Sequence, residues 1–203
     1  MKTDGSTDRK DIKRQRTMKY FLEAAKEIIE NEGVENVTVR KVADMAGYSY
    51  PSLYSYFEDL NELLWEVKSF MILSMVEALQ KTEVLPVDDI GGIKAVFKAH
   101  IAYFLEHPNI FRFFYFHRFQ KPGRVHEDAL KEPDYGAMWN ETFKELVLSG
   151  QMKAQDIEVV AKSIIYAIQG MLTLHFSNNG DLHNEGNVYR DLDKIVDYLL
   201  AAR

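Results

Sequence analysis

The residues best suited to bind another molecule lie between Arg40 and Tyr56. This short span presents a guanidinium group, hydroxyl groups and rings on Arg40, Ser49, Tyr50, Pro51, Ser52, Tyr54 and Tyr56. Guanidinium and hydroxyl groups donate hydrogen bonds to phosphate oxygens, and side chains at the start of a helix can reach base edges in a major groove. The pattern therefore favours non-covalent recognition of a nucleic acid. The alternative is a helical hairpin with an aromatic surface patch.

A basic segment precedes this span. Six basic residues stand against the single acid Asp11: Arg9, Lys10, Lys13, Arg14, Arg16 and Lys19. The net charge of the whole chain is −6, yet residues 1–57 hold 10 basic and 9 acidic residues, so the negative charge lies in the remainder. A charge run by itself more often marks a solvated helix face. Beside the span above, Lys13 and Arg14 become candidate phosphate contacts.

Two short helices and a tight turn are expected to position these side chains. Thr38 is a good N-cap for a helix over 39–45, and Gly47 permits a sharp turn. Ser49 can cap a third helix, whose buried side carries Leu53 and Phe57. This is helix-turn-helix spacing, in which the second short helix enters a major groove.

The outer face of that third helix divides by expected role. Tyr50, Pro51 and Ser52 would meet base edges. Tyr54 and Tyr56 would donate their hydroxyls to phosphates, which position the helix without reading sequence.

These residues resemble a known family. The matching segments are Thr38-Val39-Arg40-Lys41-Val42-Ala43, Ala46-Gly47-Tyr48-Ser49, Leu53-Tyr54, Tyr56-Phe57 and Glu62-Leu63-Leu64. Together they resemble the N-terminal signature of TetR-family transcriptional regulators, over about residues 13–67. The resemblance implies an all-α protein with a three-helix DNA-binding domain at 1–57 and a helical ligand-binding and dimerisation domain at 58–203.

The resemblance also implies roles and partners. By position, Thr38 and Tyr54 match phosphate contacts of the family, whereas Arg40, Tyr50 and Pro51 match positions that often meet bases. The implied partners are double-stranded DNA with a palindromic operator, a small-molecule effector and a second copy of the chain. One feature departs from the family: Glu58-Asp59-Leu60 stands where a phosphate-binding lysine is common. We therefore expect the basic segment to carry more of the attraction to DNA, so that deleting residues 1–16 weakens binding to all sequences and flattens its salt dependence.

The remainder of the chain is predicted to be helical. The expected helices are 10–32 and 39–45, a third after Ser49, and then 59–82, 88–106, 108–119, 134–149, 154–178 and 187–202. The last two long helices have apolar residues wider than one face, which predicts a homodimer interface.

Aromatic residues are concentrated in this C-terminal part. A single helix cannot bury every ring of 111–119 on one side, so a pocket for an apolar or aromatic effector is one interpretation. The candidate ligand-binding residues are Phe104, Phe111, Tyr115, His117, Trp139, Phe143, Tyr166 and His175. The alternative is that the rings simply pack a core.

Several kinds of chemistry find no support in the sequence. There is no cysteine, no phosphate-binding glycine loop and no histidine spacing typical of a metal site, so no catalytic residue, cofactor or metal is expected. No apolar run reaches the roughly 20 residues of a membrane span, and no membrane partner is expected. The leading hypothesis is a cytoplasmic DNA-binding repressor released by a ligand. The alternative is a small-molecule binding protein of the same fold that has lost DNA recognition, and an enzyme comes third.

Overall fold

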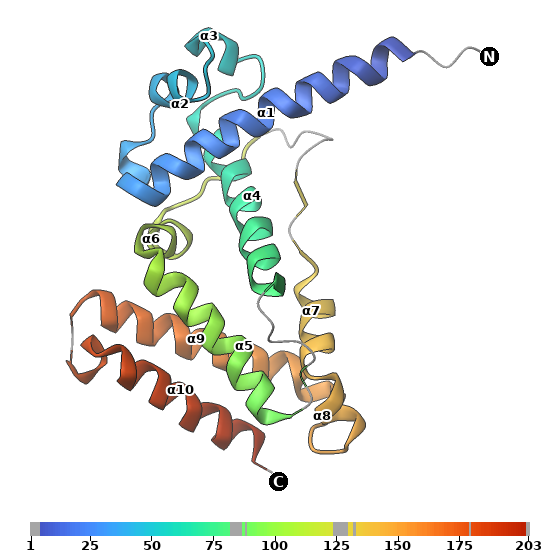
Figure 1. Cartoon of the computed structure of the whole chain (residues 1–203), viewed down its shortest axis with the longest axis vertical. Helices are drawn as coiled ribbons and strands as arrows, with labels where there is room; N and C mark the ends of the chain where they lie inside the picture. Colours follow the sequence, from blue (N-terminus) through green and yellow to red (C-terminus); the bar gives the residue numbers. More distant parts are fainter. Residues whose placement is uncertain are drawn as a thin grey trace. The chain divides into compact units, whose positions relative to one another are not determined.

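The computed structural model describes residues 5–81, 87, 89–123, 130–131, 133–178 and 180–201 (Figure 1). Within these ranges the chain forms α-helices and short 3-10 turns and no strand, which confirms the predicted all-α class. The chain divides into two compact units, Met1–Ser74 with Asn109–Glu132, and Met75–Pro108 with Pro133–Arg203. These units follow packing, so the first takes in residues on both sides of the predicted functional boundary after Phe57.

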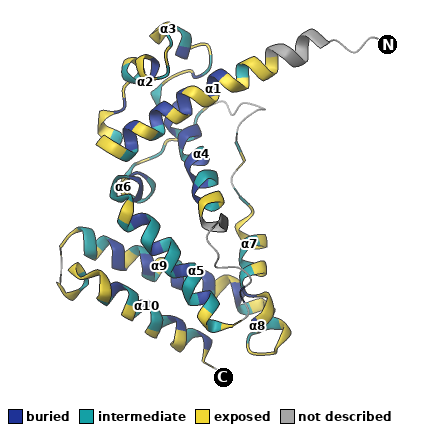
Figure 2. Ribbon diagram, in the orientation of Figure 1, coloured by how far each residue is buried: buried dark blue, intermediate teal, exposed yellow. Residues whose placement is uncertain are grey.

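The first unit is built on α1 (Gly5–Glu32), followed by a 3-10 turn, η1 (Val34–Asn36). Helices α2 (Val39–Met45) and α3 (Tyr50–Leu53) lie on one side of α1, and α4 begins at Leu60 and ends at Lys81 (Figure 1). One side of α1 is buried and the other exposed, as its apolar spacing predicts (Figure 2). The unit's apolar core side chains, each at most 4% exposed, are Phe21, Leu22, Ala25, Ile28, Ile29, Val37, Val42, Ala43, Leu53, Phe57, Leu63, Val67, Met71, Ile110, Phe111 and Phe113.

The start of α4 is fixed by carboxylates. Asp59 Oδ1 accepts a 2.8 Å hydrogen bond from the backbone N–H of Glu62, and the Glu62 carboxylate accepts from the backbone N–H of Glu58. This pairing closely matches a capping box. The next carboxylate on the same face, Glu66, is 2% exposed and accepts from the backbone N–H of Leu130. The acidic residues Asp59, Glu62 and Glu66 therefore have a structural role, because each accepts a backbone hydrogen bond at or near the start of α4.

A segment from the middle of the sequence completes the first unit. Helix α6 runs from Pro108 to Phe116, shorter than the predicted 108–119. Asn109 Nδ2 donates to the carbonyl of Glu30 at the end of α1, 3.1 Å away. Asn61 and Gln120 make two reciprocal hydrogen bonds, of 2.9 and 3.3 Å, between α4 and the chain that follows α6.

The second unit is organised around α5 (Ile90–Glu106), α9 (Ile157–Phe176) and α10 (Glu185–Leu200). Helix α10 packs against both α9 and α5, and α7 (Tyr135–Thr142) packs against α9. Two ion pairs join α5 to α10, Lys94 with Asp197 at 2.6 Å and Lys98 with Asp193 at 2.8 Å.

Several predicted boundaries differ from those observed. The predicted helix 134–149 is two helices, α7 and α8 (Lys144–Leu148), with Phe143 between them in a non-helical conformation. Backbone hydrogen bonds from Phe143 to Trp139 and from Val147 to Phe143 nonetheless continue across the break. The predicted helix 154–178 is a 3-10 turn, η2 (Ala154–Asp156), followed by α9, and a further turn, η3 (Gly180–His183), precedes α10.

Helix α9 differs from the expectation that no apolar segment is long enough to span a membrane. The segment Ala154–Phe176 is long and apolar enough to cross a membrane by length and composition, with a hydropathy of 1.4. Such helices also form the cores of other proteins, and α9 packs against α5, α7 and α10 within its unit. Only 33% of its most apolar window is buried, so much apolar surface on this helix is left uncovered in the single chain.

Candidate functional site

The two short helices have the local geometry that the sequence predicts. Thr38 Oγ1 accepts from the backbone N–H of Lys41 at 3.2 Å, so Thr38 is the N-cap of α2. The backbone N–H of Tyr48 donates to the carbonyl of Ala43, and Gly47 between them has a φ of +76°, a value that L residues rarely adopt. The predicted turn is thereby confirmed in its geometry.

Helix α3 is a single turn, followed directly by a tight non-helical turn over 54–56. Leu53 and Phe57 are 0% and 1% exposed and anchor this segment to the core. Because these two side chains point inward, the side chains between them and before them must face outward or sideways.

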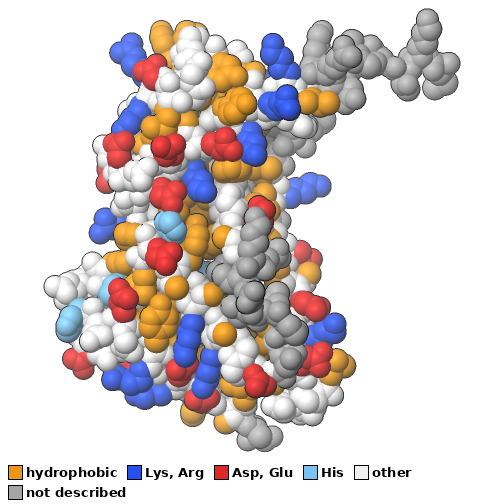
Figure 3. Space-filling model, in the orientation of Figure 1, with side chains coloured by type: hydrophobic (Ala, Val, Ile, Leu, Met, Phe, Trp, Pro, Cys, Tyr) orange, Lys and Arg blue, Asp and Glu red, His pale blue; other side chains and the backbone are white. Residues whose placement is uncertain are grey.

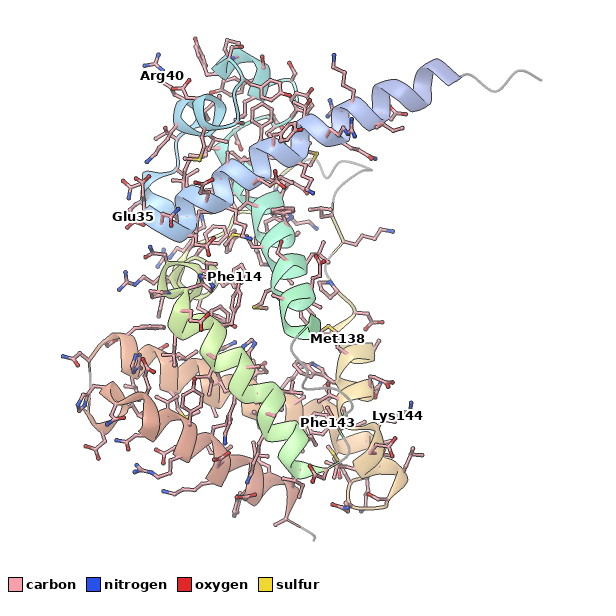
Figure 4. All side chains as sticks on the ribbon, in the orientation of Figure 1. Glu35, Arg40, Phe114, Met138, Phe143 and Lys144 are labelled. Carbon is pink, nitrogen blue, oxygen red and sulfur yellow. The ribbon has the colours of Figure 1, made fainter. Side chains whose placement is uncertain are left out.

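Seven of the ten predicted DNA contacts are exposed. Tyr50 and Tyr54 are 50% and 51% exposed, and Arg40 and Pro51 are also at the surface. The Arg40 guanidinium lies 5.9 Å from the centre of the Tyr50 ring, so one side chain of α2 and one of α3 form a joint cationic and aromatic surface. Figure 4 shows the labelled Arg40 extending away from the ribbon.

Ser49 and Ser52 are used differently from expectation. Ser49 occupies the N-cap position of α3 but its side chain makes no capping hydrogen bond. Its Oγ lies 2.8 Å from Oγ of Ser52, and the two hydroxyls pair with each other. Ser49 is exposed and Ser52 is half-buried, so a ligand that binds either must compete with this pair.

Arg14 and Tyr56, which are both half-buried, contact each other within the chain. The half-buried Tyr56 ring lies 5.5 Å from the ring of Phe21 on one side and 5.1 Å from the guanidinium of Arg14 on another. Arg14 Nη1 also donates to the backbone carbonyl of Ser55 at 3.1 Å. Lys13, by contrast, is exposed. Tyr56 is therefore less exposed than Tyr50 and Tyr54.

The exposed part of the candidate interface is consequently compact. It comprises Thr38, Arg40, Ser49, Tyr50, Pro51 and Tyr54 on α2, the turn and α3, with Lys13 on α1. On the face drawn in Figure 3, basic and hydrophobic side chains lie together over this end of the first unit, with acidic side chains among them.

The candidate ligand-binding residues fall in both units. In the first unit, Phe111 is fully buried and its ring lies 4.8 Å from that of Tyr115. His117 stacks on Phe113 at 5.6 Å, and burial lowers the pKa of its imidazole.

The remaining candidates lie in the second unit. Phe104 and Phe143 are fully buried and Trp139 is half-buried. Tyr166 is 62% exposed on α9, so its ring faces solvent in the single chain. His175 Nδ1 lies 2.9 Å from the carbonyl of Leu182, which can only accept, so Nδ1 carries a proton and donates it there.

Two residues that sequence reasoning passed over join this second group. The ring of Phe97 lies 6.0 Å from Trp139 and 6.4 Å from Phe143, and the ring of His100 meets Phe104 edge-on at 5.0 Å. We call Phe97, His100, Phe104, Trp139 and Phe143 the α5 aromatic cluster. Figure 4 shows Phe143 beside α5. The signal in the sequence was the spacing of Phe97, His100 and Phe104, which share one face of a helix.

No group of three or more histidine, aspartate or glutamate side chains in the described residues is arranged to hold a metal ion.

Comparisons with known proteins agree with this geometry. Residues 21–67 match the sequence profile of the bacterial regulatory proteins of the tetR family. A search of curated proteins found no match.

Solved structures share the fold over nearly the whole chain. The structure of RolR with its ligand resorcinol has a TM-score of 0.60 at 14% identity, covering 94% of this chain and 96% of that one. FadR from Bacillus subtilis with stearoyl-CoA has a TM-score of 0.63 at 17% identity, covering 91% and 98%. A TetR-family regulator from Mesorhizobium loti MAFF303099 has a TM-score of 0.63 at 17% identity, covering 93% and 96%. The segment 21–67 thus matches the tetR family in sequence, and the chain as a whole shares its fold with these solved structures.

Proposed function

We propose that this protein is a cytoplasmic transcriptional repressor that binds a palindromic operator as a homodimer and is released from it by a small apolar or aromatic ligand. The observation that carries the DNA-binding part is the exposed surface of Arg40, Tyr50, Pro51 and Tyr54, on a frame anchored to the core by Val42, Ala43, Leu53 and Phe57. Exposed rings and a guanidinium beside a helix N-terminus suit base and phosphate contacts in a major groove.

The test distinguishes residues that contact bases, and so recognise sequence, from residues that contact only phosphates. Fragments of the source genome that the protein retains would first be selected, and the shortest bound fragment titrated beside random DNA of equal length. Arg40→Ala should weaken binding to the selected fragment more than to random DNA. Tyr54→Phe, which removes one exposed hydroxyl, should weaken both to the same extent. Equal losses for Arg40→Ala would contradict its base-reading role.

The alternative function is a ligand-binding protein without DNA recognition. The acidic residues Glu58 and Asp59 beside the interface favour it, since like charge repels phosphate. Retention of no genomic fragment, even at low salt, would support this alternative and overturn the proposal.

The homodimer part of the proposal rests on α9. Apolar or small residues on one face recur at every third or fourth position: Val159, Ser163, Tyr166, Gly170 and Leu174. Val159, Tyr166 and Leu174 are 61%, 62% and 44% exposed, and a side chain added at Gly170 would meet nothing within 4 Å. An exposed apolar face with a small residue in its middle is suited to close packing against a second copy.

Oligomeric state tests this interface directly. Gly170→Arg has room in the single chain but would obstruct a facing helix, so it should convert a dimer into a monomer in sedimentation analysis. Leu148→Arg is the matched control, because Leu148 is 71% exposed on α8, outside the proposed interface. A Gly170→Arg variant that stays dimeric would contradict the proposal.

The ligand class rests on the aromatic residues and on relatives. The RolR and FadR structures were solved with resorcinol and stearoyl-CoA, so this fold accommodates ligands with aromatic or long apolar portions. In this chain the α5 aromatic cluster supplies rings of matching character. A ligand can release the protein from DNA only if it binds the free form more tightly than the DNA-bound form.

A further inference from the structure

His100 carries one of two enclosed side-chain atoms that make no hydrogen bond within the described residues; the other, Asp193 Oδ1, lies 2.8 Å from the ammonium group of Lys98. The Nε2 atom of His100 is enclosed by the protein and has no hydrogen-bond partner within the described part of the chain. An enclosed polar atom without a partner destabilises the folded protein, so proteins rarely keep one without a use. Another half-buried histidine of this unit, His175, does have a hydrogen bond, to the carbonyl of Leu182.

Aromatic rings lie beside His100 on α5. Its ring meets the edge of Phe104, and Phe97, one turn earlier on the same helix face, stacks with Trp139. A water molecule at Nε2 would need about two to four hydrogen-bond partners, and these aromatic rings provide none. A ligand with its own apolar body and one polar atom fits such a site better than water does.

The charge state of His100 further limits the chemical class of the ligand. Burial lowers the pKa of His100 to about 4, so the imidazole is neutral near pH 7. A neutral ring offers no charge to compensate a buried carboxylate or phosphate. A hydroxyl group, which both donates and accepts, can pair with Nε2 in either tautomer of the ring.

We infer that His100 is the polar anchor of a ligand site at the α5 aromatic cluster, and that the ligand is an uncharged molecule with an apolar or aromatic body and one hydroxyl that hydrogen-bonds to Nε2. This inference rests on the proposed function, since the ligand bound here is the one that releases DNA. It names the residue and the functional group that the proposed function leaves open.

The experiment compares matched probes on the full-length protein. Phenol and toluene form one pair, and 1-naphthol and 1-methylnaphthalene a larger one; each pair differs mainly by a hydroxyl. Binding would be measured by calorimetry at pH 7. The wild-type protein should bind the hydroxyl member of at least one pair about tenfold more tightly than its methyl partner.

Variants assign that preference to Nε2. His100→Phe keeps a planar ring of similar size and should abolish the preference, whereas His100→Gln keeps a polar atom near the position of Nε2 and should retain part of it. His107→Phe removes another histidine, at the end of α5, and should leave the preference intact. Thermal unfolding of each variant would be measured first, and His100→Phe should be at least as stable as wild type because it buries no unpaired nitrogen.

The outcomes are distinct. Equal affinity within both pairs, no binding of any probe, or a preference that persists in His100→Phe would overturn the inference. A His100-dependent preference without release of selected DNA would uphold the ligand site and contradict the proposed function instead.

Discussion

Arg14 donates a hydrogen bond from its guanidinium to the backbone carbonyl of Ser55, 41 residues later in the chain, at a distance of 3.1 Å. This contact ties the middle of α1 to the turn that follows α3. A basic residue that the sequence marks as a phosphate contact thereby orients the neighbouring helix. Two basic residues adjacent in sequence, Lys13 and Arg14, thus have separable roles.

Arg14→Ala should lower the free energy of unfolding by about 1 kcal/mol, since it removes a charge-assisted hydrogen bond and the contact with Tyr56. It should weaken DNA binding while leaving the salt dependence of binding nearly unchanged. Lys13→Ala is the paired control: its stability should be unchanged, and the slope of log K against log salt should become shallower by about 1. Deleting residues 1–16 would mix the two effects. Urea unfolding and salt titrations of both variants measure them, and a shallower slope for Arg14→Ala with full stability would reverse the assignment.

Glu58→Lys should strengthen binding to all DNA sequences. The Glu58 side chain is exposed and only its backbone N–H takes part in the cap of α4, so the substitution leaves that hydrogen bond available. A lysine here would stand beside Asp59 and Leu60, the positions where the resemblance implies a phosphate-binding lysine, and the salt slope should steepen by about 1. Glu58→Gln removes the repulsion without adding a contact and should give an intermediate affinity at low salt. Unaltered affinity in both variants would place this position away from the DNA.

Asp59→Ala should destabilise the first unit by about 1 kcal/mol, within the usual range for loss of an N-cap. The reason is the 2.8 Å hydrogen bond from the backbone N–H of Glu62 to the Asp59 carboxylate. Asp59→Asn keeps an acceptor oxygen and should recover most of that loss. Thermal unfolding compares the three proteins, and equal stability of Asp59→Ala and wild type would refute the capping role.

Because of His100, the free energy of unfolding should be lower at pH 5 than at pH 7. Its folded pKa of about 4 lies below the unfolded value of about 6.5, so above pH 6.5 the imidazole is neutral in both states. As the pH falls below 6.5 only the unfolded state gains a proton, and stability is lost until the pH nears 4. Between pH 7 and pH 5 the loss from this group is about 2 kcal/mol.

Urea unfolding at several pH values checks this. His100→Phe should lack that part of the acid-side loss, while substitution of the exposed His183 by glutamine should leave it in place. A His100→Phe variant with the wild-type pH profile would count against a neutral, enclosed imidazole.

Local signals predicted the frame of the DNA-binding region well. The predicted bounds of α2, 39–45, are those observed, because both its cap, Thr38, and the turn at Gly47 depend on neighbouring residues alone. The end of α3 was less predictable. Its single turn gives way to residues held by α1 through the Arg14–Ser55 and Phe21–Tyr56 contacts, which no local pattern encodes.

The ligand site shows the same limit more strongly. A run of aromatic residues says that rings are plentiful, but not which ones share a cluster. Phe111 and Tyr115 pack in the first unit, whereas Phe104, Trp139 and Phe143 belong to the second.

The path of the chain through the first unit bears on how the protein is made. Residues 1–74 leave the ribosome well before residues 109–132, which supply the partners of Glu30, Asn61 and Glu66. During synthesis the nascent N-terminal helices therefore lack part of their final packing while most of the second unit's α5 is being added. An N-terminal fragment ending near residue 74 holds every candidate DNA contact but lacks these packing partners, so it should fold less stably than the intact protein. The first unit can therefore reach its final packing only after translation has passed residue 132.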